Sequence, residues 1–358
     1  MVYAHFGGRH ADIAYAHDGR LETPIKIDSA WGTFEWLLTN GFPLGHRSGV
    51  GCNSDGHKSC PGASYPGAAS FGAYGGLTCF LTDELSRDGL FNCLRRCHHY
   101  GTTGCRMHLD LRAHFAGGAT LFDRNPNLFR HTACQPVYQL MMGDIIETGN
   151  GHATLTVEIA ARAPIEWVEI RNGAAQVEIY RPYGADDLGE RLRVIWSGAE
   201  YHCRGRQRQW RGRARFSGRE VAKINAWNPE RLLEQRPPDT VVWDALTTGN
   251  FGGFYAYLAP GASSRLQIIT NHGDLTANLD DLRLKDVVLD AGGLGRQVRD
   301  FRLPLENPHR EVSFTTHGAL TAQGDNPLWV CVTLRAVSKP GAARFKPLTA
   351  RRRGNRRR

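Results

Sequence analysis

The pattern of apolar residues changes near residue 113, and this change limits the folds open to the chain. Before it, short apolar runs alternate with helical patterns and glycine-rich loops, and the strand-like runs are residues 1–5, 24–28 and 47–52. After it, apolar residues recur at every second position in short runs separated by turn-forming residues. The first pattern predicts an α/β layer and the second an antiparallel β-sandwich.

Three local signals sharpen this prediction. Residues 33–38 read as a short helix, and Ser86 is placed to cap a second helix that ends before Gly101. Asn172 and Gly173 stand between two β-rich runs, which is a strong hairpin signal. Gly89 inside the second helical pattern weakens that prediction slightly.

Length and cysteine content indicate an ordinary intracellular protein. The 358 residues are enough for two cores, and 41% hydrophobic with 22% charged residues is usual for globular chains. No run of about 18 apolar residues suggests a membrane span, and the first residues lack the apolar centre of a signal peptide. Nine scattered cysteines favour reduced thiols, so we expect a cytoplasmic protein with no membrane association.

The net charge of +9 belongs to the C-terminal tail. Residues 339–358 contain nine basic and no acidic residues, and the remainder carries 35 of each. Such a tail would bind polyanions weakly and without sequence preference, through contacts to phosphates. The alternative is a disordered end without a selected role.

The chemistry suggested by the sequence lies directly after the third strand-like run. Asp55, Gly56 and His57 form a turn in which a carboxylate and an imidazole can point at one ion. Oxygen and nitrogen ligands of this kind suit zinc, manganese or iron, and an ion so held generates hydroxide near neutral pH. Taken alone, the tripeptide is weak evidence, because an Asp-Gly turn beside a surface histidine explains it more simply.

The residues around this turn extend the motif. Residues 53–58, followed by 61–67, 71–78 and 100–104, resemble an uncharacterised family of the PHP (polymerase and histidinol phosphatase) superfamily. The likeness covers residues 1 to about 115 and extends more loosely to 168–173 and 196–201.

The resemblance implies a distorted β/α barrel whose rim binds two or three metal ions, usually for phosphoester hydrolysis. On that pattern His5, Asp55 and His57 are the metal ligands, and the metal-bound hydroxide is the nucleophile. His10 and Asp28 are further candidates, as ligands or as neighbours of the ligands. Lys58, Tyr100 and Thr102 would contact a phosphorylated small molecule.

Departures from the family are as informative as the matches. The chain lacks the His-x-His strand with which a PHP barrel opens, so the first half of the barrel is missing. Lys26 stands where relatives tend to carry an acidic residue, and Asp28 is two positions on, on the same strand face. A lysine there would repel a metal ion. We therefore expect an incomplete site, completed by a second polypeptide if it is to act.

The sequence thus predicts an α/β plus all-β protein in three parts. Residues 1–113 would form a partial PHP-like barrel, 114–338 a β-sandwich and 339–358 a disordered basic tail. The expected function is that of a metal-dependent phosphoesterase, incomplete as this chain alone. The alternative is a non-catalytic binding module derived from such an enzyme, whose sandwich binds carbohydrate or protein.

Overall fold

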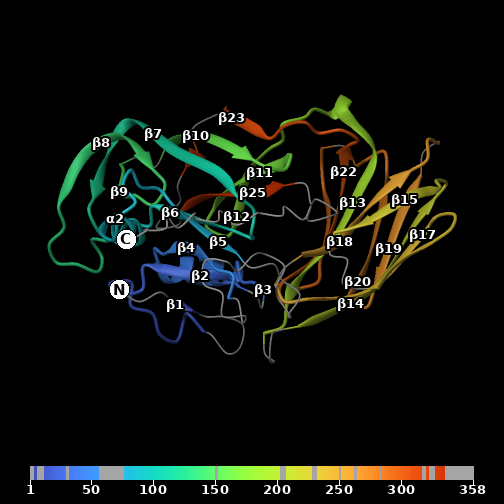
Figure 1. Cartoon of the computed structure of the whole chain (residues 1–358), viewed down its shortest axis with the longest axis horizontal. Coiled ribbons are helices and arrows are strands. Elements are labelled where there is room, and N and C mark those ends of the chain that lie inside the picture. The colour runs from blue at the N-terminus through green and yellow to red at the C-terminus, as the bar shows by residue number, and fades with distance from the viewer. Residues whose placement is uncertain are drawn as a thin grey trace, which may run out of the picture.

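The computed structural model shows a chain built almost entirely from antiparallel strands (Figure 1). It describes residues 4–5, 12–29, 32–55, 76–149, 152–201, 207–227, 232–249, 251–261, 264–282, 284–316, 320–321 and 327–334. Within these ranges, α-helix is confined to α1 (Trp36–Gly41) and α2 (Arg87–Arg96). The predicted α/β fold with a partial β/α barrel is therefore wrong, because no helix layer alternates with the strands. No helix in the described ranges is long and apolar enough to cross a membrane.

The N-terminal sheet contains the parallel strands of the fold. Strands β1 (Ala4–His5), β2 (Pro24–Ser29) and β4 (Gly49–Cys52) run parallel, with β2 in the middle. The short β3 (Gly32–Thr33) folds back antiparallel on β2, and α1 and the 3-10 turn η1 (Phe42–Leu44) then lead to β4. The α1 helix begins later than the predicted residues 33–38 because Thr33 is held in β3, where its hydroxyl donates to Asp28.

A hairpin interrupted by a helix follows. Strands β5 (Leu77–Phe80) and β6 (His99–Thr102) pair antiparallel, and α2 connects them. The predicted cap is confirmed: Ser86 Oγ accepts a hydrogen bond of 3.0 Å from the backbone N–H of Gly89. The helix ends at Cys97, whose φ of 56° is left-handed.

Two antiparallel sheets continue the first half of the molecule. The six-stranded sheet contains β7 (Met107–Phe122), β8 (Cys134–Met141), β9 (Ile145–Glu147), β10 (His152–Ala161), β23 (Glu311–Thr315) and β24 (Leu320–Thr321). The three-stranded sheet contains β12 (Ala175–Tyr180), β11 (Ile165–Asn172) and β25 (Leu328–Leu334). The predicted Asn172-Gly173 hairpin is confirmed between β11 and β12, with Gly173 at a φ of 56°. Strand β7 runs across residue 113, the expected boundary between the first two parts of the chain.

The second half consists of two five-stranded antiparallel sheets. One has the order β15 (Val221–Ala226), β18 (Phe251–Leu258), β13 (Leu188–Ala199), β22 (Leu294–Pro304) and β21 (Val287–Asp290), and β13 follows the 3-10 turn η2 (Ala185–Asp187). The other has the order β16 (Leu232–Arg236), β17 (Thr240–Thr247), β14 (Arg208–Ser217), β19 (Arg265–Thr270) and β20 (Gly273–Asn278).

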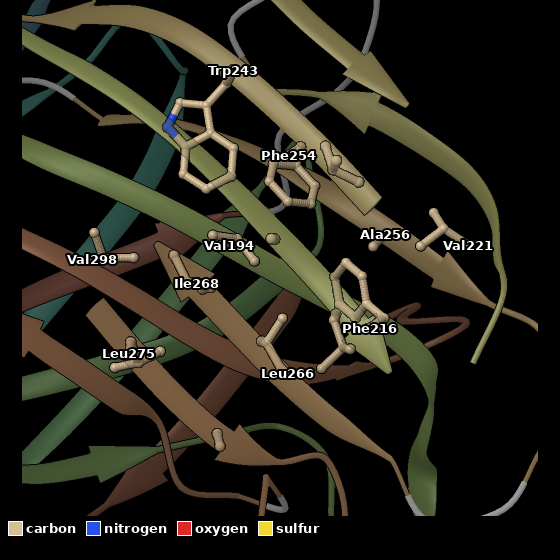
Figure 2. Close-up of a cluster of buried hydrophobic side chains, with 14 of the residues drawn as sticks. Val194, Phe216, Val221, Trp243, Phe254, Ala256, Leu266, Ile268, Leu275 and Val298 are labelled. Atoms are coloured by element: carbon tan, nitrogen blue, oxygen red, sulfur yellow. The ribbon is translucent and has the colours of Figure 1, made fainter. Parts of the chain in front are cut away.

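These two sheets enclose the largest apolar core. Val194 and Phe254 from the first sheet meet Phe216 and Ile268 from the second (Figure 2). Alternate residues of each strand enter this core, as the period-two pattern requires. The opposite face of β13 turns towards β11, so the first sheet is covered on both sides.

Candidate functional site

Three strand ends meet at one edge of the N-terminal sheet. Because β1, β2 and β4 are parallel, their carboxyl ends lie on the same side. His5 is the register partner of Lys26, and Asp28 is the register partner of Cys52. Asp55 follows β4 by three residues. The edge therefore gathers His5, Asp28 and Asp55, three of the residues that the sequence nominated.

Lys26 and Asp55 form an ion pair at this edge. Lys26 Nζ lies 3.6 Å from Asp55 Oδ1, and the side chains are 6% and 24% exposed. Burial lowers the pKa of the Lys26 ammonium, and the carboxylates of Asp55 and Asp28 oppose that shift. Asp55 adopts a left-handed φ of 46°, which aspartate tolerates better than most residues. The carboxylate nominated as a metal ligand thus has a cationic partner supplied by the chain itself.

Asp28 is buried deeper in the same edge. Its side chain accepts a hydrogen bond of 2.7 Å from the Thr33 hydroxyl at Oδ1. Burial raises its pKa well above the usual range, and the Thr33 hydrogen bond and the Lys26 charge only partly offset this. The surroundings of Asp28 therefore disfavour its ionised form, which is the form in which a carboxylate binds a metal ion.

The β5–β6 hairpin closes over Asp28 through a glycine. A Cβ placed on Gly76 would lie 2.5 Å from Asp28 Oδ2 and from Cys52 Cβ, and 2.8 Å from the Thr102 carbonyl oxygen. The Thr78 hydroxyl donates to the Cys52 carbonyl oxygen at 2.8 Å, which ties β5 to the end of β4. Gly76 is thus the contact that lets this hairpin approach the edge.

Tyr100 and Thr102, the predicted substrate contacts, hold the hairpin together. Tyr100 is buried, and its hydroxyl donates to the Met107 carbonyl oxygen at 2.7 Å and accepts from the Leu109 N–H at 3.2 Å. Thr102 Oγ1 donates to the Cys105 carbonyl oxygen at 2.7 Å. Both polar side chains are engaged with backbone groups. Their substrate role stays a prediction.

The remaining nominated residues lie largely outside the described ranges. This applies to His10, His57 and Lys58, and for His5 the backbone alone is described. Within the described ranges, no three His, Cys, Asp or Glu side chains are grouped closely enough to hold a metal ion. Among the described donors, Asp55 is already paired with an ammonium and burial disfavours the ionised form of Asp28, an arrangement that suits a divalent ion poorly.

A second polar cluster, which the sequence did not reveal, lies between β11 and the β13 sheet. We call it the charged layer. Glu166 accepts from Arg191 Nη2 at 3.1 Å and is ion-paired with Arg193 Nη1. The Arg193 guanidinium carbon lies 3.8 Å from the Trp227 ring centre and 4.6 Å from that of Tyr255. Glu166 and both arginines are at most 1% exposed, so these charges are compensated by each other and by aromatic faces.

The charged layer continues towards the N-terminal sheet. Glu169 accepts from Trp167 Nε1 at 3.1 Å, from Arg171 Nε at 2.9 Å and from Arg299 Nη1 at 3.0 Å. Burial raises the pKa of Glu169, but the two guanidinium groups outweigh it and hold that pKa below its usual range. Arg299 also pairs with Asp286, which in turn pairs with Arg181.

The arginines of β13 give a misleading sequence signal. Arg191 and Arg193 alternate with Leu192 and Val194, which is the usual pattern of a strand with one solvent-facing side. Here both faces are buried. The acidic partners on β11 are too distant in sequence for any local pattern to connect them.

No protein-family model, curated protein or solved structure matches this chain.

Proposed function

We propose that this chain is a non-catalytic descendant of metal-dependent PHP-type hydrolases, retained as a binding module. The observation that supports this is the Lys26–Asp55 pair of 3.6 Å at the shared strand edge. An ammonium beside a carboxylate supplies the positive charge that a metal ion would otherwise supply. It also repels a divalent ion electrostatically.

The burial of Asp28 supports the same proposal. A metal-binding carboxylate is ionised, whereas burial raises the pKa of Asp28, and the Thr33 hydrogen bond, which favours the ionised form, only partly offsets that rise. The binding role falls to the β-sandwich, whose two sheets enclose the largest core, with carbohydrate or another protein as the ligand class.

The seven described cysteines are all free thiols, which supports a reducing compartment such as the cytoplasm.

Metal content tests this proposal. Protein purified from cells grown with added zinc, manganese and iron should contain far less than one ion per chain by plasma mass spectrometry. Lys26→Met, which removes the ammonium, should raise the manganese content. Stoichiometric metal in the wild-type protein, lost in Asp55→Asn and kept in the exposed-site control Asp83→Asn, would overturn it.

A second candidate function is a metal-dependent phosphoesterase, and the parallel arrangement of β1, β2 and β4 favours it. This arrangement brings His5 and Asp55 to one edge. Oxygen and nitrogen ligands there would suit zinc, manganese or iron, which supplies hydroxide at neutral pH when bound.

Hydrolysis of bis(p-nitrophenyl) phosphate with added Mn²⁺ separates the two candidates. Metal-dependent turnover that Asp55→Asn abolishes and Asp83→Asn preserves would establish the phosphoesterase. No turnover, with or without the metal, agrees with the non-catalytic proposal. A mixture with a polypeptide carrying a His-x-His strand tests whether a second chain completes the site.

A further inference from the structure

Two half-buried histidines from separate segments stack on each other near the N-terminal sheet. His17 lies in the connection between β1 and β2, and His46 lies in the turn between η1 and β4. Their ring centres are 4.2 Å apart, with the planes tilted by 48°. The His17 side chain is 2% exposed. Nε2 of each ring and Nδ1 of His17 are buried and have no hydrogen-bond partner among the described residues.

Glu22 holds one of the two rings. Its Oε2 lies 3.0 Å from His17 Nδ1 and also accepts from the Asp18 N–H at 3.1 Å. This contact is close enough for an ion pair, but its geometry does not make a hydrogen bond. His17 Nε2 is likewise buried, next to the ring of His46.

The stacked pair joins the β1–β2 connection to the body of the fold. Gly19, two residues after His17, packs under Leu128, whose Cδ1 lies 2.7 Å from where a Cβ would stand. On the other side of the pair, the backbone N–H of His46 donates a hydrogen bond to the Gly41 carbonyl oxygen at the end of α1. The same connection contributes Ile13 to the core around α1.

Protonation would break this contact. Burial lowers the pKa of His17, and the nearby His46 lowers it further, whereas Glu22 and Asp18 act in the opposite direction. A charged His17 ring would need water or a partner at its buried Nε2, which has no hydrogen-bond partner among the described residues.

We propose that the His17–His46 pair is an acid-sensitive latch that holds the β1–β2 connection, residues 12–23, against the turn before β4. The His17 ring is neutral in the closed form. As the pH falls below the usual histidine range, protonation favours a form in which the connection separates from the turn. The latch is independent of the proposed function, although β1 and β2 carry His5 and Lys26.

Among the described residues, the acidic groups that act on His17 are Glu22 and Asp18. Glu22 and Asp18 belong to the connection, and Arg20 neutralises Asp18 through Nη2 at 2.8 Å. From the turn before β4, Arg47 reaches Asn125 at 3.5 Å, and the facing residue of the 123–130 turn is the apolar Leu128. Among the described residues, Glu22 is therefore the close countercharge of the His17 ring.

Hydrogen exchange measured by mass spectrometry tests the latch on the full chain. Protection of residues 12–23 is compared at pH 7.5, 6.5 and 5.5 after correction for the intrinsic exchange rate. Peptides from the two five-stranded sheets report whether the rest of the protein stays folded. The variants are His17→Gln, His46→Gln, the double variant, and His131→Gln as an exposed-histidine control. His46→Phe keeps an aromatic ring against His17 without its charge.

We expect wild-type protection of residues 12–23 to fall by about tenfold or more between pH 7.5 and 5.5, with the sheet peptides unchanged. The double variant should lose most of this pH dependence, His46→Phe part of it and His131→Gln none. Equal pH dependence in the wild-type and double variants would overturn the latch. So would a pH dependence that disappears when EDTA is present throughout, because a bound metal would then be its cause.

Discussion

The Lys26–Asp55 ion pair should contribute to the stability of the fold. Asp55→Asn leaves an ammonium that is 6% exposed without its countercharge. We expect a loss of about 1–3 kcal/mol in the free energy of unfolding, measured by urea titration at pH 7. Asp83→Asn, at an exposed site, should change it by less than about 0.5 kcal/mol. An equal effect of the two substitutions would mean that the ion pair does not stabilise the edge.

The buried His99 should make the stability of the protein depend on pH. It is buried against Gly49, and burial lowers its pKa to about 4. In the folded protein the His99 ring stays neutral, whereas in the unfolded chain it takes up a proton below about pH 6.5. The free energy of unfolding therefore decreases as the pH is lowered from about 6.5 to about 4. Relative to pH 7, His99 should lower the free energy of unfolding by about 2 kcal/mol at pH 5 and by about 3 kcal/mol at pH 4.

Urea titrations of the wild type and His99→Gln between pH 7 and 4.5 measure this loss. The wild type should lose stability relative to the variant as the pH falls, with no further divergence above pH 6.5. A constant difference across the whole range would show that the His99 ring is not excluded from water in the folded protein.

At the residue scale, the sequence predicts which side chains lie at the shared strand end, but not that Lys26 pairs with Asp55 there. Asp55 was recognised through its neighbours in the motif, and Lys26 was noted as a residue that repels metal. That the two touch depends on the pairing of β2 with β4, whose residues are more than twenty positions apart. No local pattern encodes such a contact.

Between strands, two glycines make room for a stacked pair of tryptophans. Trp196 of β13 and Trp243 of β17 stack with ring centres 4.8 Å apart and planes within 2°. The Trp243 ring lies against Gly212 of β14, and the Trp196 ring against Gly252 of β18, so a Cβ at either position would collide with it. Gly212→Ala should destabilise the protein by about 1–3 kcal/mol through overpacking.

Thermal unfolding followed by circular dichroism measures this effect. Gly149→Ala serves as the matched control, because nothing lies within 4 Å of a Cβ there. A Gly212→Ala protein as stable as the control would show that the indole pair can shift without cost.

Elements with strong local signals were the predictable ones. The Ser86 cap fixes the start of α2, and the Asn172-Gly173 turn fixes the β11–β12 hairpin. The helix near residue 33 begins later than predicted, because pairing of β3 with β2 overrides the local helical pattern.

At the scale of the whole molecule, the charged layer joins the two halves. Glu166→Gln would leave Arg191 and Arg193 in the interior with a weaker partner. We expect a loss of about 3–5 kcal/mol, with the near-ultraviolet circular dichroism of the surrounding tryptophans altered. Glu158→Gln, at an exposed position of β10, should stay within about 0.5 kcal/mol of the wild type. Similar stabilities for both variants would contradict a structural role of the layer.

The whole fold was the least predictable level. The family resemblance implied a barrel, whereas three parallel strands pair with one another and the chain continues into antiparallel sheets. Late segments also return to early ones, since β25 pairs with β11 and β23 with β10 (Figure 1). Pairings across so many residues depend on the complete set of apolar faces, and periodicity alone does not specify them.

The central claim is that a lysine occupies the cation's place beside Asp55, and calorimetric titration with Mn²⁺ at pH 7.5 tests it most directly. The wild type, Lys26→Met, Asp55→Asn and Lys26→Met combined with Asp55→Asn are compared. We predict no measurable binding by the wild type, and binding by Lys26→Met that the second substitution removes. Tight Mn²⁺ binding by the wild type that Asp55→Asn abolishes would contradict the claim.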